Sequence, residues 1–341
     1  MHSNRHQPVV LMTGLLLNEK FAIVCSATRS SVALSSCQKD LDQFVPDPST
    51  GYDTWYNTID NTMPVGDLKQ NLLLPVYKDS FNLNTTTVTI NTGSGLQCNF
   101  IAGSIQNAAN NPVTGNIFIE TYLLKKKGDM IRMSTPTTSN GRMLVSGGEL
   151  FVRLTKDAGE LNLTNTGRYY ISYNDSAASS LMRLFDGDET NPAIFNWLPT
   201  QDSMGFVSAA LNQSYSLSTN RLHWINCDYF YDTTGIPRTI VSAGLPASYT
   251  NANTVAYTVF NDMHSVIGMY GNATTRKFSS GKLPANKQIT VVIISKQGND
   301  YFLGHEQGTT VGSSGTVNDQ QVIVTPVITS LDNIKAYLNS L

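Results

Sequence analysis

Short runs of alternating apolar and polar residues, separated by turn residues, constrain the fold of this chain most. The alternation has the two-residue period of a β-strand with one buried face. Gly, Asn and Pro bound most runs, which is typical of antiparallel strands joined by tight turns. Before residue 175 we expect strands at residues 86–92, 96–101, 116–123, 149–155 and 168–173. After residue 203 we expect eight more, at residues 215–218, 222–231, 238–243, 255–260, 264–270, 289–296, 300–304 and 320–325.

The alternation lapses between about residues 175 and 205, where Asn, Asp, Ser and Pro dominate. Even without its first 36 residues, this 341-residue chain is longer than one hydrophobic core usually serves. The sequence therefore predicts an all-β protein with a first antiparallel β-sandwich at residues 76–190 and a second at residues 205–341. A short C-terminal helix should follow, because Ser330 is suited to cap it and Leu331, Ile334, Leu338 and Leu341 recur on one face. Asn140-Gly141 predicts a hairpin turn with positive φ at both positions.

The first 36 residues have the features of an export signal. Arg5 precedes apolar stretches at residues 9–17 and 21–24, and small residues lead up to Cys37. No apolar stretch approaches the roughly 20 residues needed to span a bilayer. Signal peptidase II cleaves before such a cysteine, whose thiol then carries diacylglycerol. The alternative is an ordinary signal peptide followed by a chance cysteine.

The run Leu34-Ser35-Ser36-Cys37-Gln38-Lys39-Asp40 resembles the lipobox of Bacteroidota outer-membrane lipoproteins. In that group, acidic residues after the cysteine accompany export to the outer face, and Asp40 and Asp42 follow this tendency. Arg29 departs from it by interrupting the hydrophobic region. The resemblance implies a signal peptide at residues 1–36, a lipidated Cys37 and an outer-membrane protein that faces the cell exterior. Residues 37–75 are rich in Pro and Gly and are predicted to form a stalk, with Trp55 and Tyr56 packed back onto the first domain.

Residues 96–163 carry a second resemblance. They contain Phe100-Ile101-Ala102-Gly103-Ser104-Ile105 and Asn111-Pro112-Val113-Thr114-Gly115, followed by Pro136-Thr137-Thr138-Ser139 and Ser146-Gly147-Gly148. This pattern looks like the ZU5-like β-sandwich module that recurs in Bacteroidota surface lipoproteins. The resemblance implies a fold and says little about function, although related modules mediate protein contacts.

The composition argues against nucleic acid as a partner. Charged residues are 14% of the chain and the formal net charge is −2, so there is no electrostatic footprint for nucleic acid. The one cationic run, Lys125-Lys126-Lys127, is interpreted as a solvated loop. Cys98 and Cys227 lie in apolar runs of different predicted domains, so we expect buried free thiols and no disulfide.

A search for catalytic or metal-binding motifs finds only fragments. His305-Glu306 lacks a second His four positions on, and no K-T-G follows Ser279-Ser280-Gly281-Lys282. Gly312-Ser313-Ser314-Gly315 is one residue short of G-x-S-x-G. Asp186-Gly187-Asp188-Glu189 lacks the ligand spacing of an EF-hand and is interpreted as a solvated acidic turn. We therefore predict no enzyme, no metal and no cofactor.

Trp224, Asn226 and Asp228 are the candidate ligand-binding residues. Alternation along residues 222–231 turns Ile225, Cys227, Tyr229 and Tyr231 to the core and these three side chains to the opposite face. An aromatic ring beside an amide and a carboxylate on an outer β-face suits a sugar. The alternative is that a loop or the C-terminal helix covers Trp224.

Three functions remain open on the sequence alone. The first is a non-enzymatic, lipid-anchored surface protein that serves adhesion, envelope assembly or the capture of a glycan or another envelope protein. The second is an accessory glycan-binding lipoprotein of a polysaccharide-uptake system, and the third is an unrecognised hydrolase.

Overall fold

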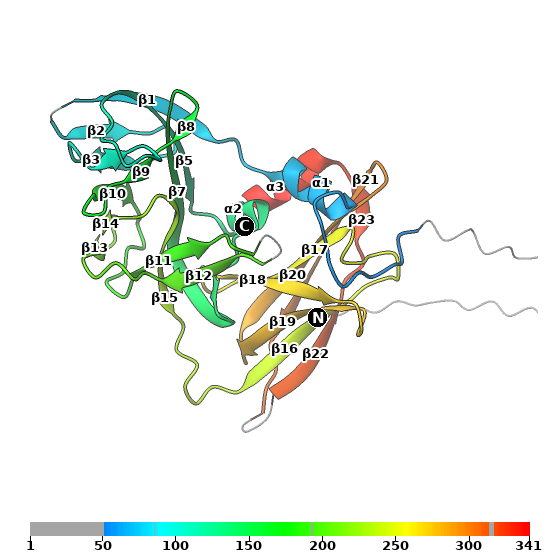
Figure 1. The fold of residues 1–341 in the computed structure, drawn as a ribbon. Helices are drawn as coiled ribbons and strands as arrows, with labels where there is room; N and C mark the ends of the chain where they lie inside the picture. Colours follow the sequence, from blue (N-terminus) through cyan, green and yellow to red (C-terminus); the bar gives the residue numbers. More distant parts are fainter. Residues whose placement is uncertain (1–50, 85, 192–193, 314–316) are drawn as a thin grey trace, which may run out of the picture. The chain divides into compact units, whose positions relative to one another are not determined.

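The strands form three large sheets, and the computed structural model describes them over residues 51–84, 86–191, 194–313 and 317–341. The pairings are antiparallel except for one parallel pair, and three short helices accompany the strands (Figure 1). The predicted all-β sandwich fold with a short C-terminal helix is confirmed. The signal segment, Cys37 and the first part of the predicted stalk lie outside the described residues. No helix in the described ranges is long and apolar enough to cross a membrane.

The first two sheets pack face to face as a β-sandwich. The first sheet has the order β1 (Tyr77–Leu83), β5 (Gly115–Leu124), β7 (Arg142–Lys156), β15 (His223–Phe230), β11 (Arg183–Asp188) and β12 (Asn196–Pro199), with β6 (Thr138–Ser139) and β8 (Gly159–Glu160) beside β7. The second has the order β13 (Phe206–Ala210), β14 (Ser214–Thr219), β10 (Tyr169–Asn174), β3 (Gln97–Phe100) and β2 (Val88–Asn91). A short ribbon, β4 (Ile105–Gln106) with β9 (Asn162–Leu163), lies apart from them. Alternate residues such as Val152, Ile171 and Ile225 fill the core between the two sheets.

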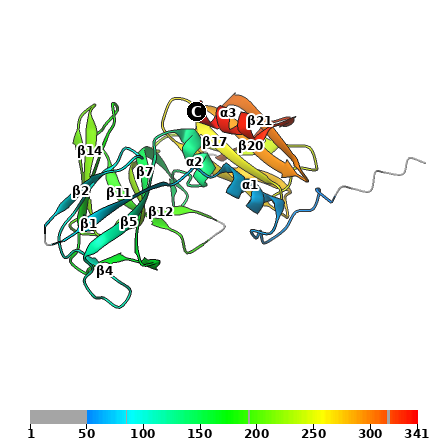
Figure 2. The ribbon, with the colours of Figure 1, turned by 90° about the horizontal axis from the view of Figure 1, so that it is seen from above.

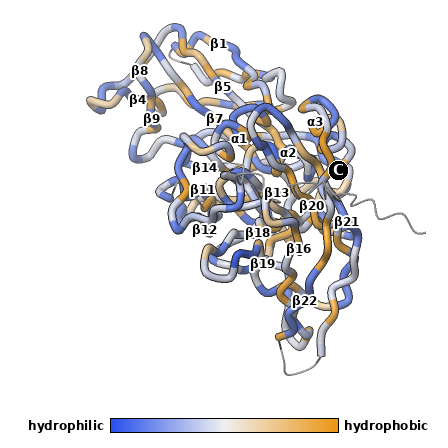
Figure 3. Tube along the Cα trace, turned by 90° about the vertical axis from the view of Figure 1, so that its right-hand side faces the viewer, coloured by the Kyte–Doolittle hydropathy of each residue, from blue (hydrophilic) through white to orange (hydrophobic). Residues whose placement is uncertain are grey.

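The third sheet folds over onto a core of its own. Its order is β22 (Val317–Ile323), β16 (Arg238–Gly244), β19 (Lys277–Pro284), β18 (Val266–Asn272), β17 (Thr254–Phe260), β20 (Gln288–Gln297), β21 (Asp300–Thr309) and β23 (Val327–Thr329). Val322 of the outer strand β22 shares one apolar cluster with Val241 and Ile293. Every residue of β17 is buried, and the apolar run of β20 is orange in Figure 3, because both faces of these two strands are covered.

Three helices cover the outer face of β17 and β20. They are α1 (Pro64–Leu72), α2 (Lys127–Met133) and α3 (Leu331–Asn339), and Figure 2 shows them gathered beside these strands. Leu68, Ile131 and Leu338 enter one apolar cluster with residues of β17 and β20 and with Trp197 and Trp224 of the first sheet. The predicted cap of the last helix is confirmed, since Ser330 Oγ accepts a hydrogen bond of 3.1 Å from the backbone N–H of Asn333.

The expected boundary between the two halves of the chain needs correction. Strands β13, β14 and β15 complete the first two sheets, so the change to the third sheet falls between Phe230 and Arg238 and not near residues 175–205. The segment in which the alternation lapses instead contains β11 and β12. Whether two parts of the chain fold separately stays a prediction.

The predicted stalk is packed from residue 52 onward. Residues 64–72 form α1, because Pro64 occupies the first turn of a helix, where its missing N–H is not needed. The Trp55 ring centroid lies 5.1 Å from that of Phe278 in the third sheet. The backbone N–H of Tyr56 donates to Asn251 Oδ1 at 3.1 Å. These two residues therefore pack on the third sheet and not on the first sandwich.

The cysteines and the lysine run also differ in part from expectation. Cys98 and Cys227 are buried free thiols, as predicted, but both lie in the core of the first sandwich. Lys125 and Lys126 are exposed loop residues, as expected, whereas Lys127 is half-buried and begins α2. Their ammonium groups donate to three separate backbone carbonyls, at 2.7 Å for Lys125 to Asn174, 2.9 Å for Lys126 to Asn339 and 2.6 Å for Lys127 to Phe260. The run thereby links the sandwich, α3 and β17.

Candidate binding surface

The face of β15 that carries Trp224 is covered. Trp224 is 8% exposed, and its ring packs 5.2 Å from Phe151 and 6.1 Å from Tyr122, centroid to centroid. The predicted alternation is correct for Ile225, Cys227 and Tyr229, which pack in the sandwich core, and for Trp224, which faces the opposite way. Tyr231 was expected in the same core but packs against the core of the third sheet. The helices and the third sheet pack on that opposite face, so the expected open sugar platform is absent there.

Asn226 and Asp228 belong to a buried polar network. A β-bulge between them brings the Asn226 amide within 2.7 Å of Asp228 Oδ2, to which it donates. Glu149, directly opposite Asn226 on β7, accepts a hydrogen bond of 2.5 Å from the hydroxyl of Thr135. Burial raises the pKa of both carboxyl groups well above their ordinary values. The network keeps both carboxyl groups buried inside the protein and does not open to a ligand.

The other motif fragments do not converge on a site. The His305 ring stacks on Tyr337, and the Ser279 hydroxyl lies 3.0 Å from that of Ser242. Asp186 lies near Arg221, Asp188 accepts from Thr190 and Glu189 lies near His223, so the acidic turn points to three different partners. Within the described ranges, no group of three or more His, Cys, Asp or Glu side chains is arranged to hold a metal ion.

The outer face of the second sheet is the most distinctive exposed surface. None of the residues in its five strands is charged. Sheet faces exposed to water normally carry charged side chains, which are about a quarter of the residues in soluble domains. An exposed sheet without them presents only amides, hydroxyls and rings.

One row of polar side chains crosses all five strands in register. Its members, each opposite the next, are Asn91, Gln97, Ser172, Ser216 and Ser208. The Gln97 amide donates to Asn91 Oδ1 at 3.0 Å, and the Ser172 hydroxyl donates to Gln97 Oε1 at 3.3 Å. Because neighbouring strands lie about 4.8 Å apart, the row offers hydrogen-bonding groups at regular intervals. A hollow of about 490 Å³ is lined by Asn91, Gln97, Ser172 and Ser216 of this row.

A second row beside it carries the aromatic rings. Thr89, Asn99, Tyr170, Ser218 and Phe206 are paired across the same strands. Tyr170 is 43% and Phe206 is 48% exposed. The Asn99 side-chain oxygen is buried and has no hydrogen-bond partner among the described residues. We call these two adjacent rows the neutral sheet face.

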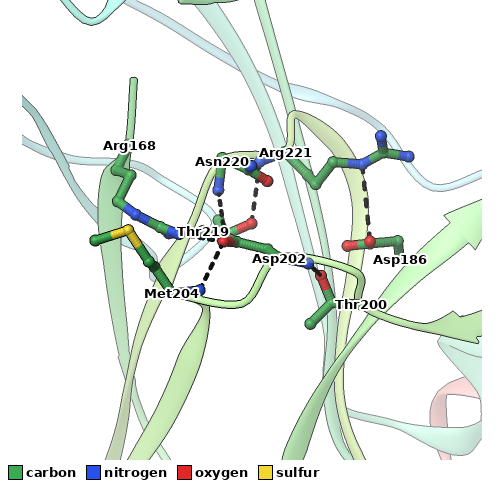
Figure 4. A network of polar contacts seen from close by, with 8 residues as sticks. All are labelled: Arg168, Asp186, Thr200, Asp202, Met204, Thr219, Asn220 and Arg221. Atoms are coloured by element: carbon green, nitrogen blue, oxygen red, sulfur yellow. Dashed lines mark hydrogen bonds and ion pairs between the residues drawn. The ribbon is translucent and has the colours of Figure 1, made fainter. Parts of the chain in front are cut away.

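An ion pair at the ends of three strands positions this face (Figure 4). Arg168, just before β10, donates from both Nη atoms to the carboxylate of Asp202, with the Nη1–Oδ2 bond at 2.7 Å. The same carboxylate accepts from the backbone N–H of Met204 at 3.0 Å and of Asn220, just after β14, at 3.2 Å. The pair therefore fixes the loop before β13 to the ends of β10 and β14. Nearby, burial raises the pKa of Asp186, which lies 3.8 Å from Arg221.

The sequence contained a signal for this face that the search for motifs passed over. In Tyr169–Asn174 and Ser214–Thr219 the outward positions are Tyr, Ser and Asn, with no charged residue. Strand position was predictable from the alternation, but the pairing that aligns Gln97 with Ser172 and Ser216 depends on contacts between distant segments.

Comparisons with known proteins do not assign a family. No family model matches the sequence, and no curated protein matches it. Among solved structures, the Bacillus anthracis TIE protein is similar over 74% of this chain and 34% of that chain, with 9% sequence identity and a TM-score of 0.17. This chain spans about a third of that structure, and a similarity of this size supports no argument. The resemblance to ZU5-like lipoproteins stays a prediction.

Proposed function

We propose that this chain is a non-enzymatic, lipid-anchored cell-surface protein that binds an uncharged polysaccharide on the neutral sheet face. The observation that carries this proposal is the exposed Tyr170 and Phe206 beside the row of amides and hydroxyls, on a sheet whose strands hold no charged residue. A neutral sugar chain offers hydroxyls to the polar row and apolar ring faces to the aromatic row.

The absence of charge favours a neutral ligand over an ionic one. A charged group on the ligand would lose water on binding and would find no opposite charge among these strands, which is costly. Uncharged hydroxyls exchange their water hydrogen bonds for hydrogen bonds to amides with little net cost. Gln97 and Asn91, already hydrogen-bonded to each other, are held in place for that exchange.

The anchor supports a surface role for such a binding face. The sequence before Cys37 is suited to lipidation, and an anchor of two or more acyl chains keeps a protein stably on a membrane. A polysaccharide-binding face on a tethered protein retains the polymer at the cell surface. The same chemistry serves adhesion or the delivery of polysaccharide to an uptake system.

Binding to an array of neutral and acidic polysaccharides, followed by calorimetry on the best neutral ligand, tests the proposal. Gln97→Ala and Tyr170→Ala should each weaken binding at least about tenfold, the effect of losing about 1.4 kcal/mol. Phe118→Ala is a matched control, because Phe118 is an equally exposed ring on β5 of the first sheet. A preference for acidic polymers, or unchanged binding by both variants, would reject the neutral sheet face as the site.

A further inference from the structure

A second cavity lies beside α1 of the helix layer. Its volume is about 330 Å³, and its lining comes from α1, from residues 57–61 and from β17 and β18. It shares no lining residue with the hollow on the neutral sheet face. Its volume is within the range of about 300–1,000 Å³ that is usual for small-molecule sites.

Among the residues that the structure describes, Lys69 is the only cationic side chain that lines this cavity. It lies in the last turn of α1, is half-buried and makes no hydrogen bond or ion pair with any described residue. Two other lysines near the helices have partners. The Lys296 ammonium group lies 2.5 Å from the Asp67 carboxylate, and Lys127 donates a hydrogen bond to a backbone carbonyl. Burial lowers the pKa of Lys69, and no neighbouring carboxylate offsets this effect. A helix C-terminus favours a cation but does not replace the hydrogen bonds of its ammonium group.

The remaining polar groups of the cavity do not complement Lys69. Asp60 accepts hydrogen bonds from the backbone N–H and the hydroxyl of Thr62 at its exposed rim. The Asn251 amide is occupied by the backbone of Tyr56, with bonds of 3.1 and 2.6 Å. The hydroxyl of Tyr270, by contrast, has no hydrogen-bond partner among the described residues, and its ring is 42% exposed. The Lys69 ammonium group and the Tyr270 hydroxyl thus remain as unused donors, beside the exposed polar side chains of Asn57, Thr58 and Asn61 at the rim.

The rest of the lining is largely apolar. Phe195, Val255, Met269 and Phe278 contribute side chains to the walls. A single unpaired cation balances one negative charge, which fits a carboxylate better than a dianionic phosphate. An aromatic or aliphatic body would pack on the apolar walls while its acid group accepts from the two donors.

We propose that this cavity binds a small organic monocarboxylate, whose acid group accepts hydrogen bonds from Lys69 and Tyr270 and whose carbon skeleton packs on the apolar walls. The site is separate from the neutral sheet face, and this proposal does not depend on the proposed polysaccharide function.

Phenylacetate and its uncharged analogue phenylacetamide are the probes for this site. Ligand-observed NMR on the whole exported chain should show phenylacetate binding at least about tenfold more tightly than phenylacetamide. Lys69→Met should remove that preference, and Tyr270→Phe, which keeps the exposed ring, should weaken only the carboxylate. Lys335→Met on α3 is the matched control, because Lys335 is also a half-buried helical lysine but does not line the cavity.

A measurement of the Lys69 pKa with and without ligand completes the test. With ¹³C-labelled lysine, saturation with phenylacetate should raise the pKa of Lys69, because the bound carboxylate favours the ammonium form. Equal binding of acid and amide, full binding by Lys69→Met that is folded by circular dichroism, or no binding of either probe would overturn the proposal.

Discussion

The backbone of Gly128 in α2 lies directly against the backbone of Leu338 in α3. A Cβ atom placed on Gly128 would lie 1.7 Å from the carbonyl oxygen of Leu338, far closer than van der Waals contact. The two helices approach this closely because residue 128 has no side chain. The Lys126 ammonium group holds the same junction from one side through its 2.9 Å bond to the Asn339 carbonyl.

Gly128→Ala should therefore displace α3 from the helix layer. We expect a loss in the free energy of unfolding of about 1–3 kcal/mol, as for other overpacked sites, because the clash is with backbone and not with a flexible side chain. Urea denaturation measures the loss. Gly281→Ala is the control, since a Cβ there would meet no atom closer than 3.9 Å. Equal stability of the two variants would show that α3 is not packed as described.

The buried carboxyl groups of Glu149 and Asp228 should make stability depend on pH. A carboxyl whose folded pKa is raised keeps its proton in the folded state after the unfolded chain has lost it. The contribution to stability is full below the unfolded pKa and is lost as pH rises through the folded pKa. Burial raises both folded pKa values here, so the free energy of unfolding should fall as the pH is raised from about 4, the ordinary carboxyl range, toward neutrality.

Glu149→Gln isolates one of the two groups. The amide keeps the shape of the side chain and does not ionise, so part of the decline with pH should disappear. The free energy of unfolding measured in denaturant across this pH range checks the prediction. Glu306→Gln, at an exposed position on β21, should leave the slope unchanged. A wild-type stability that rises over the range would contradict the buried acid pair.

Strand positions followed from the sequence where one face of the strand is buried and the other is polar. The expected runs at residues 168–173, 215–218 and 222–231 correspond to β10, β14 and β15, and the Asn140-Gly141 turn has positive φ at both residues. The helix cap at Ser330 was also predictable, because it depends only on residues close to it in the sequence. Each of these features depends on neighbouring residues, so the sequence was enough.

The features that were missed depend on distant contacts. Helix α1 begins at Pro64 in a segment rich in turn residues, and its apolar side chains are explained only by β17 and β20 on the far side of the chain. Strand β19 was not predicted, because its exposed residues include Lys277 and Lys282 and make the segment polar. The rings packed against Trp224 include Phe195 and Trp197, which come from a distant part of the sequence, so alternation placed the ring on the correct face without revealing what packs there.

The Arg168–Asp202 pair should matter more than other ion pairs of this protein. Both side chains are nearly buried, so removing one leaves the other charge in a dry environment. We expect Arg168→Leu to cost about 3–5 kcal/mol, and the double variant Arg168→Leu with Asp202→Asn to recover part of that loss. Lys78→Ala, which removes an exposed partner of Glu120, should cost less than about 1 kcal/mol. Chemical denaturation of the parent, the single variants Arg168→Leu and Asp202→Asn, and the double variant gives the coupling free energy. Additive losses would mean that the pair contributes no more than a surface contact.

Cys37 is expected to carry the lipid anchor. Cys37→Ser should abolish labelling by a fatty-acid probe and release the protein from membranes, because the acyl chains supply the membrane affinity. Cys25→Ser, within the predicted signal segment, is the matched control and should leave labelling intact. Continued labelling and membrane association of Cys37→Ser would show that the anchor lies elsewhere.

Trp224→Ala and Tyr170→Ala should give opposite results, because one ring is buried and the other lies on the neutral sheet face. Truncation of Trp224 removes a ring packed against Phe151 and Tyr122, and should cost about 3–5 kcal/mol. Truncation of Tyr170 opens no cavity and should leave the melting temperature nearly unchanged while weakening polysaccharide binding. Thermal denaturation and calorimetric titration on both variants check the pair. If Trp224→Ala stays as stable as the parent and loses ligand binding, the sugar site lies on β15 after all, and the assignment to the second sheet is wrong.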